Sequence, residues 1–274
     1  MSDNIFIKSV LSGTSGAGAM TIQVSSLMWL RTIMNYQYKN GGTLKDTSKL
    51  LYKQGGIFRF YQGYIPALMI GPISRFGDTF VNTLSLELFN NNNKFKDTPI
   101  FVQTAFASVL AGIWRISTIP IDAWKTSKQV HGKDGIIILQ NRYKKDGIKS
   151  LYQGAMASSL ATMIGHYPWF LTYNYLNSYL PKYRYDENIS LALLRNATIG
   201  FSASAVSDTV SNSMRVIKTV KQTNTNNIKY IDIVKTIGIR GLLFRGLETK
   251  ILTNGIQGIV FSVFFKFFQE KIKI

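Results

Sequence analysis

The stretch "PIDAWKTSKQ", Pro120 to Gln129, follows a nearly uncharged segment and carries a proline, an acid and a base at fixed offsets. Pro120, Asp122 and Lys125 stand at its positions 1, 3 and 6. An acid and a base three residues apart lie on one face of a helix. A proline removes a backbone hydrogen bond and kinks a helix. The stretch therefore predicts a helix that is kinked at Pro120 and carries an ion-pairing face where it leaves an apolar environment.

The same pattern recurs twice along the chain. The stretches "SLMWLRTIMN" (26–35) and "SMRVIKTVKQ" (213–222) align with the first one without gaps. The basic position then recurs at spacings of 94 and 93 residues, as Arg31, Lys125 and Lys218. A turn glycine recurs in the same phase at spacings of 91 and 92, as Gly63, Gly154 and Gly246. Landmarks that keep one phase predict a single domain made of three repeats, over 5–90, 98–181 and 188–274.

Long uncharged runs indicate membrane-spanning helices. No charged residue lies between Lys8 and Arg31, or between Lys149 and Lys182, and roughly 20 helical residues cross a bilayer core. Four shorter runs need one or two charges inside the span, which is tolerated where the charge faces a wet interior. They cover 60–74, 98–114, 196–207 and 251–265. The sequence therefore predicts an all-α protein with six transmembrane helices, two in each repeat.

The net charge of +18 is unevenly placed, which argues against nucleic-acid binding. The three segments 31–59, 125–149 and 215–245 hold 20 of the 32 basic residues. With two spans per repeat, these segments fall on one side of the membrane and both termini fall on the other. Basic segments beside a membrane attract anionic lipid headgroups. We therefore expect membrane lipid as a partner and no nucleic acid.

The residue types needed for catalysis are scarce. Cysteine is absent and there are two histidines, His131 and His166, so no nucleophile–base set or metal-ligand spacing is present. We expect neither an enzyme nor a metal site.

Over essentially the whole chain the sequence resembles the mitochondrial carrier family. The family motif is Pro-X-acid-X-X-base at the end of each odd helix, with an aromatic-base-Gly element about 30 residues later. Repeat 2 holds the first element intact, and repeat 3 holds the second as Phe244, Arg245 and Gly246. The resemblance implies a barrel of six tilted helices with short matrix-side helices. It also implies transport of a small metabolite by alternating access across the inner mitochondrial membrane, with both termini in the intermembrane space.

The resemblance implies a matrix gate of ion pairs between repeats, and this chain departs from it. The acidic position holds Met28, Asp122 and Arg215. Carried over, Asp122 would pair with Lys218, Lys125 would face Met28, and Arg31 would face Arg215. One pair survives, one is lost and one becomes repulsive.

The gate on the opposite side is an aromatic-acid-X-X-base motif on the even helices, 20 residues past the turn glycine. Its aromatic position is kept only at Tyr173 and Phe265. Its acidic and basic positions read Thr83 with Leu86, Asn174 with Asn177, and Lys266 with Gln269. No ion pair is possible there, so we expect this gate to close by amide hydrogen bonds and apolar contact.

The resemblance also places candidate substrate contacts on the even helices, at Ile70, Ala161, Thr162 and Thr253, with His166 in a further position. This set is poor in charge compared with the basic cluster expected for nucleotides. A lone histidine in an apolar helix is more often a hydrogen-bonded core residue than a ligand.

Two intramembrane charges, Arg115 and Asp208, each precede the Pro/Ser position by five residues and so fall at one depth. Mutual pairing and substrate binding by Arg115 are both open interpretations.

The turns at Gly63, Gly154 and Gly246 predict bound cardiolipin, because backbone N–H groups at a helix N-terminus bind phosphate. Gln62 and Gln153 stand where the family usually has a base, so we expect stronger binding beside Arg245.

Two functions remain open. One is a transporter with an atypical gate. The other is a structural accessory subunit of an inner-membrane assembly, such as a respiratory complex, that has lost its gating charges.

Overall fold

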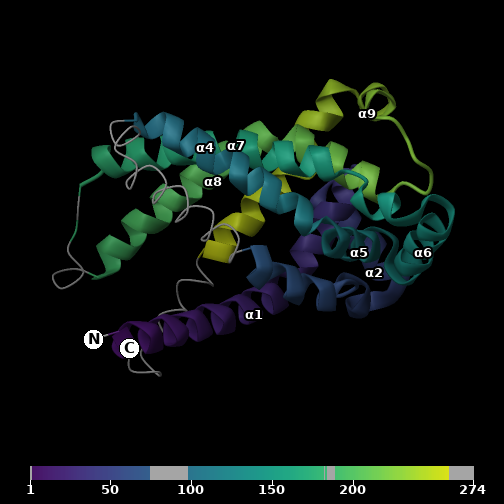
Figure 1. Cartoon of the computed structure of the whole chain (residues 1–274). Coiled ribbons are helices and arrows are strands. Elements are labelled where there is room, and N and C mark those ends of the chain that lie inside the picture. Colours follow the sequence, from purple (N-terminus) through teal and green to yellow (C-terminus); the bar gives the residue numbers. More distant parts are fainter. Residues whose placement is uncertain (1, 75–97, 182, 184–188, 259–274) are drawn as a thin grey trace.

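The computed structural model describes residues 2–74, 98–181, 183 and 189–258, and all regular structure in these ranges is helical (Figure 1). Short 3-10 turns at Gly132–Asp134 and Gly147–Tyr152 flank α6. The helices are α1 (Ser2–Asn40), α2 (Leu44–Phe60), Tyr64–Ser74, α4 (Ile100–Ser117), α5 (Ile119–His131), α6 (Gly135–Asp146), α7 (Ala155–Tyr179), α8 (Ile189–Thr223), α9 (Tyr230–Phe244) and 247–258. The predicted all-α class is confirmed.

The three helices that carry the repeated basic position meet one another. α1, α5 and α8 pack pairwise, and α7 packs against both α4 and α8. In Figure 1 the N-terminal end of α1 points away from the region where α2, α5 and α6 gather, and α9 lies at that same end. The basic segments that sequence placed together therefore lie at one end of the helices.

The bend predicted at Pro120 is a helix break that begins two residues earlier. α4 ends at Ser117 and α5 starts at Ile119, with Thr118 between them. Pro120 then lies in the first turn of α5, where its missing N–H removes no helical hydrogen bond. α1 and α8 run unbroken through Ser26 and Ser213 at the equivalent position, so the break occurs only in the copy that has the proline.

Arginines from the basic segments bind the C-terminal carbonyl groups of neighbouring helices. Arg59 Nη1 and Nη2 donate to the carbonyls of Gln129 and Val130, at 2.9 and 2.8 Å. Arg142 donates to the carbonyl of Gln222, and Arg245 donates to that of Lys39 at 3.1 Å. A guanidinium at a helix C-terminus meets unpaired carbonyl groups and the negative end of the helix dipole. These contacts link α2 to α5, α6 to α8, and the end of α9 to α1.

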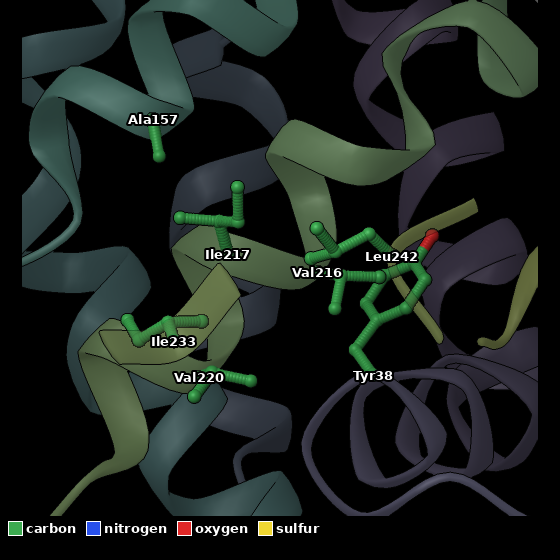
Figure 2. Close-up of a cluster of buried hydrophobic side chains, with 7 residues drawn as sticks. All are labelled: Tyr38, Ala157, Val216, Ile217, Val220, Ile233 and Leu242. Carbon is green, nitrogen blue, oxygen red and sulfur yellow. The ribbon is translucent and has the colours of Figure 1, made fainter. Parts of the chain in front are cut away.

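An apolar cluster packs α9 against α8 (Figure 2). Val216, Ile217 and Val220 on α8 pack with Ile233 and Leu242 of α9, and Tyr38 and Ala157 complete the cluster from α1 and α7. Burying these side chains stabilises the arrangement by roughly 1.5–3 kcal/mol for each large one. Four segments far apart in sequence are thereby held together next to the basic end.

Among the described residues, no single helix combines the length and apolarity needed to cross a membrane. One pair, Val102–Ser117 with Ile119–Tyr179, meets that criterion jointly and is bent by 67° at its break.

Candidate functional site

A cavity of about 230 Å³ lies where α1, α5, α7, α8 and helix 247–258 converge. Its lining is basic: Arg31, Arg115, Lys125, Arg215, Lys218 and Lys250. Asp122 is the single acidic residue of the described chain that lines it. A second cavity of about 140 Å³ adjoins it, sharing Arg115 and Arg215 and adding His166. The arrangement suits a ligand that carries several negative charges.

The predicted ion pair between Asp122 and Lys218 is confirmed. Asp122 is 5% exposed, and its carboxylate binds Lys218 of the neighbouring helix α8. It also accepts a hydrogen bond from Lys125 Nζ at 2.5 Å, one turn along its own helix. Gln222 Nε2 donates to the same carboxylate at 3.4 Å. Asp122 therefore ties α5 to α8 at the base of the cavity.

Lys125 pairs within its own helix instead of facing Met28. Met28 is fully buried and packs with Val24 and Ala67. Gln129 fills the junction between α1 and α5: its Nε2 lies 3.7 Å from the Met28 sulfur, and its Oε1 accepts from Asn35 Nδ2 at 2.6 Å. Amide hydrogen bonds thus occupy the place of the lost ion pair.

Arg31 and Arg215 both line the cavity, and each has polar contacts with different side chains. Arg215 Nη2 pairs with Asp208 at 3.2 Å, two turns back on α8, and its Nε donates to Ser211 Oγ at 3.1 Å. Arg31 Nη2 donates to Gln257 Oε1 at 3.1 Å. The predicted repulsion is reduced because the acid at Asp208 is within reach of Arg215.

The interpretation that Arg115 pairs with Asp208 is wrong. Arg115 Nη1 donates to Ser74 Oγ at 2.8 Å. Asp208 is bound by Arg215 and by the amide of Asn254. α7 lies between α4, which carries Arg115, and α8, which carries Asp208. Arg215 and Asn254 are nearer to the Asp208 carboxylate and satisfy it. Arg115 instead lines both cavities.

The other predicted substrate contacts are mostly brought together. Ala161 and Thr162 line both cavities, and Thr253 lines the larger one. His166 lines the smaller cavity, with its ring edge-to-face on Phe170 at 6.1 Å. Ile70 is buried but is not among the residues that line either cavity.

On helix 247–258, three lining residues were not predicted from the sequence: Lys250, Asn254 and Gln257. Lys250 Nζ donates to Asn254 Oδ1 at 3.2 Å, and Asn254 in turn binds Asp208. Their spacing of four and three residues places them on one helix face with Thr253. The regular spacing of these polar residues after Gly246 is the sequence feature from which they could have been predicted.

The opposite gate is only partly within the described residues. Thr83, Phe265, Lys266 and Gln269 lie outside them. Tyr173 stacks on Trp169 with ring centroids 5.0 Å apart, and Asn174 is exposed. Asn177 accepts from Arg195 Nη2 at 2.9 Å through its side-chain oxygen. An arginine of α8 thus binds the amide at one predicted gate position.

The three turn glycines share one geometry. Gly63, Gly154 and Gly246 have φ of 87°, 86° and 66°, a region that favours glycine. A Cβ at Gly63 would lie 2.8 Å from the Lys125 carbonyl oxygen, and one at Gly154 would lie 2.9 Å from that of Lys218. At Gly246 it would lie 2.8 Å from the ring of Tyr38. Each glycine allows the start of one helix to approach α5, α8 or α1 closely.

Burial displaces the pKa values of several residues at the basic end, and His131 and Tyr230 are two of them. Burial lowers the pKa of His131, whose Nε2 lies 2.7 Å from the Thr223 carbonyl oxygen. Burial raises the pKa of Tyr230, and the nearby backbone amides of Ala157 and Gly154 oppose this shift. Tyr230 thus contacts one of the turns predicted to bind lipid phosphate.

The model of the family described as "Mitochondrial carrier protein" matches residues 97–184 and 190–273. The chain therefore belongs to the mitochondrial carrier family.

Three curated relatives are similar to it. The peroxisomal adenine nucleotide transporter 1 of Saccharomyces cerevisiae is 23% identical over 58% of either chain. The mitochondrial substrate carrier family protein E of Dictyostelium discoideum is 30% identical over 45% of either chain. The chloroplastic nicotinamide adenine dinucleotide transporter 1 of Arabidopsis thaliana is 26% identical over 57% of this chain and 50% of its own. The chain spans about half the length of the curated relatives it matches.

Proposed function

We propose that this chain is a membrane transporter that carries a small anionic metabolite by alternating access. The observation that carries the proposal is the cavity where α1, α5 and α8 meet, which six basic side chains and one acidic one among the described residues line. Positive charge with low-dielectric walls raises the local concentration of an anion and binds it strongly.

The proposed architecture is a barrel of six tilted transmembrane helices in three repeats. It is supported by contacts that recur in cyclic order. Gly63 lies against α5, Gly154 against α8 and Gly246 against α1. Arg59, Arg142 and Arg245 bind the ends of the same three helices in the same order. A pattern in which each repeat contacts the next and the third contacts the first is expected of a closed ring.

The proposed gate on the basic side consists of Asp122 and Lys218, with Lys125 sharing the carboxylate. Opening this side requires α5 and α8 to separate, which breaks the cross-helix ion pair. Both residues are largely buried but line the cavity, so water that enters as α5 and α8 separate replaces the lost interaction.

The proposed substrates are nucleotides or dinucleotides. Two of the relatives are named as transporters of adenine nucleotide and of nicotinamide adenine dinucleotide. Phosphate groups match arginine well because a guanidinium donates two parallel hydrogen bonds to one phosphate. We place the protein in the inner mitochondrial membrane with cardiolipin bound at the glycine turns. The relatives named as peroxisomal and chloroplastic make the location a point to be tested.

Uptake into liposomes tests the function. Purified full-length protein is reconstituted, and uptake of labelled ADP, AMP and NAD is compared with that of adenosine and with protein-free vesicles. Saturable uptake of one of the three anions supports the proposal. Absence of uptake of all three, with the protein co-migrating with a large complex in native electrophoresis, would favour the structural-subunit hypothesis. Fluorescence microscopy of a tagged chain checks the location.

A further inference from the structure

Three further glycines of the basic end share a backbone geometry of their own. Gly56, Gly147 and Gly238 follow one another at spacings of 91 residues. Their φ values are 59°, 65° and 70°, and their ψ values are −148°, −156° and 165°. Among the described residues, no atom lies within 4 Å of the position that a Cβ would take at any of the three. The direction of the backbone, and not a close approach of another segment, therefore requires glycine here.

An isoleucine with an exposed side chain follows each of these glycines. Ile57, Ile148 and Ile239 are 66%, 64% and 75% exposed. A single exposed apolar residue is common on any protein and needs no explanation. Here the same residue type follows the same glycine-only turn in all three repeats. The three turns therefore share one feature, an apolar side chain that the backbone directs away from the core.

Aromatic and basic side chains accompany the three isoleucines. An exposed aromatic residue follows each isoleucine after four or five positions, as Tyr61, Tyr152 and Phe244. Exposed bases stand close to the same turns, as Lys53, Lys149 and Arg240. Apolar residues enter the boundary between lipid headgroups and acyl chains, tyrosine rings lie at the headgroup level, and bases attract anionic headgroups. The composition of each turn fits the surface of an anionic bilayer.

The threefold repetition favours a bilayer over a protein as the partner. In the proposed ring of repeats, equivalent positions lie at one level around the axis. Figure 1 shows α2, α6 and α9, which precede or contain the three turns, at the same end of the helices. A protein partner would contact one repeat, whereas a membrane that surrounds the ring contacts all three alike.

We propose that Ile57, Ile148 and Ile239 are anchors that insert into the leaflet on the basic side, at the boundary between the headgroups and acyl chains of anionic lipid. They set the depth of the protein in the bilayer and hold the ends of the short helices at its surface. This contact is apolar and differs from the phosphate contact predicted at the turn glycines. The inference rests on the proposed function, because it needs the membrane architecture proposed there.

Spin labels placed at one position at a time test the anchors, because the chain contains no cysteine of its own. Full-length Ile57→Cys, Ile148→Cys and Ile239→Cys proteins are labelled with a nitroxide and reconstituted into vesicles of phosphatidylcholine and phosphatidylglycerol. Electron paramagnetic resonance then compares collisions with oxygen, which is enriched in lipid, and with a water-soluble nickel chelate present on both sides of the vesicles.

We expect the ratio of oxygen to nickel collisions at all three positions to be several-fold higher than in water, at a depth of about 5–10 Å. Asn226→Cys, in the exposed polar loop between α8 and α9, is the matched control and should report water.

Two results would overturn the anchors. One is a collision ratio at the three isoleucine positions that equals that of Asn226→Cys, or that exceeds it in only one or two repeats. The other is dipolar broadening within a single-label variant, which would assign the exposed isoleucines to contact with a second copy of the chain.

Ile164→Cys, at an exposed position of α7, separates this proposal from the proposed function. A label in lipid at Ile164, with labels in water at the three turns, would retain the membrane architecture and reject the anchors alone. Labels in water at all four positions would reject both. Labels in the leaflet at the three turns, in a protein without uptake of ADP, AMP or NAD, would retain the anchors and reject the transport function.

Discussion

The Asp122 carboxylate of α5 and the Lys218 ammonium of α8 form an ion pair that joins two helices at the base of a basic cavity. Lys125 approaches the same carboxylate to 2.5 Å. Asp122 therefore supplies the negative charge that pairs with both Lys125 and Lys218. Removing one partner of a buried ion pair leaves the other charge uncompensated and costs about 3–5 kcal/mol.

Asp122→Asn should accordingly lower the stability of the protein by a few kcal/mol and abolish or uncouple uptake, because Lys125 and Lys218 then repel each other. Uptake and thermal unfolding of the same preparation measure both effects. Asp134→Asn, at an exposed position of the turn after α5, is the control. Uptake that survives Asp122→Asn unchanged would reject the gate assignment.

The glycine turn before α7 predicts a steric effect. Gly154 has a φ of 86°, and a Cβ there would lie 2.9 Å from the Lys218 carbonyl oxygen. Gly147 has a φ of 65° with no atom within 4 Å of its Cβ position. Alanine strains the backbone by about 1–3 kcal/mol at such positions, and more at Gly147, whose φ of 65° and ψ of −156° suit only glycine. Gly154 is close to the left-handed helical region, with a ψ of 2°, but only Gly154→Ala also pushes α8 away.

Gly154→Ala should therefore be at least as destabilising as Gly147→Ala in thermal or denaturant unfolding, although its backbone strain is the smaller of the two. A clearly smaller loss of stability in Gly154→Ala would show that backbone strain alone accounts for the effect and that the close approach to α8 contributes little.

The sequence was sufficient for the features that depend on the repeat. The family resemblance implied the ion pair of Asp122 and Lys218, and Pro120 predicted a bend within two residues of where the helix breaks. The sequence did not predict which of several candidate side chains would bind a given charged group. Sequence placed Arg115 and Asp208 at one depth, yet it could not show that Arg215 lies nearer to Asp208 on the same helix. Lys250 was missed because it stands just before an uncharged run, where it looked like the edge of a span.

Arg59 offers a test of the contact between α2 and α5. Its guanidinium is 6% exposed and donates to two successive carbonyl groups at the end of α5. A lysine has no planar fork and is not equivalent at such a site. Arg59→Lys should destabilise the protein by about 1.5–3 kcal/mol, the range for a hydrogen bond to a charged group.

Unfolding by heat, compared with Lys53→Gln on the exposed face of α2, measures this loss. A lysine that preserves full stability would indicate that the positive charge, and not the paired donors, holds the end of α5.

His131 predicts a dependence of stability on pH. Its Nε2 lies 2.7 Å from the Thr223 carbonyl oxygen, so the neutral ring donates there. Burial is the main cause that lowers its pKa below the ordinary 6.5, and the nearby Lys39 and Arg59 add to it. The unfolded chain then binds more protons than the folded one as the pH falls. The stabilising contribution is present above pH 6.5 and is lost as the pH drops below it.

Thermal unfolding between pH 7.5 and 5 should show this loss, and His131→Gln should flatten it, because a glutamine amide can still donate to Thr223 but does not titrate. A slope that persists undiminished in His131→Gln would assign the pH dependence to other groups.

A substitution beside the turn before α7 tests the prediction that cardiolipin binds at this turn. The Tyr230 hydroxyl lies near the backbone amides of Gly154 and Ala157, at the start of α7. The Lys221 ammonium lies 5.1 Å from the centre of the Tyr230 ring. The hydroxyl therefore competes with any lipid phosphate for this helix N-terminus. Tyr230→Phe keeps the ring and removes the competitor.

We expect Tyr230→Phe to retain more cardiolipin per protein than the wild type after purification, as measured by lipid mass spectrometry. Tyr143→Phe, at an exposed tyrosine of α6, should match the wild type.

The turn at Gly246 carries Arg245, whose charge adds to the attraction of the backbone N–H groups for phosphate. Arg245→Gln should therefore reduce retention, although it also removes the hydrogen bond to Lys39. Equal retention in the wild type and Tyr230→Phe would exclude the turn at Gly154 as a lipid site, and cardiolipin absent from every preparation would exclude all three turns.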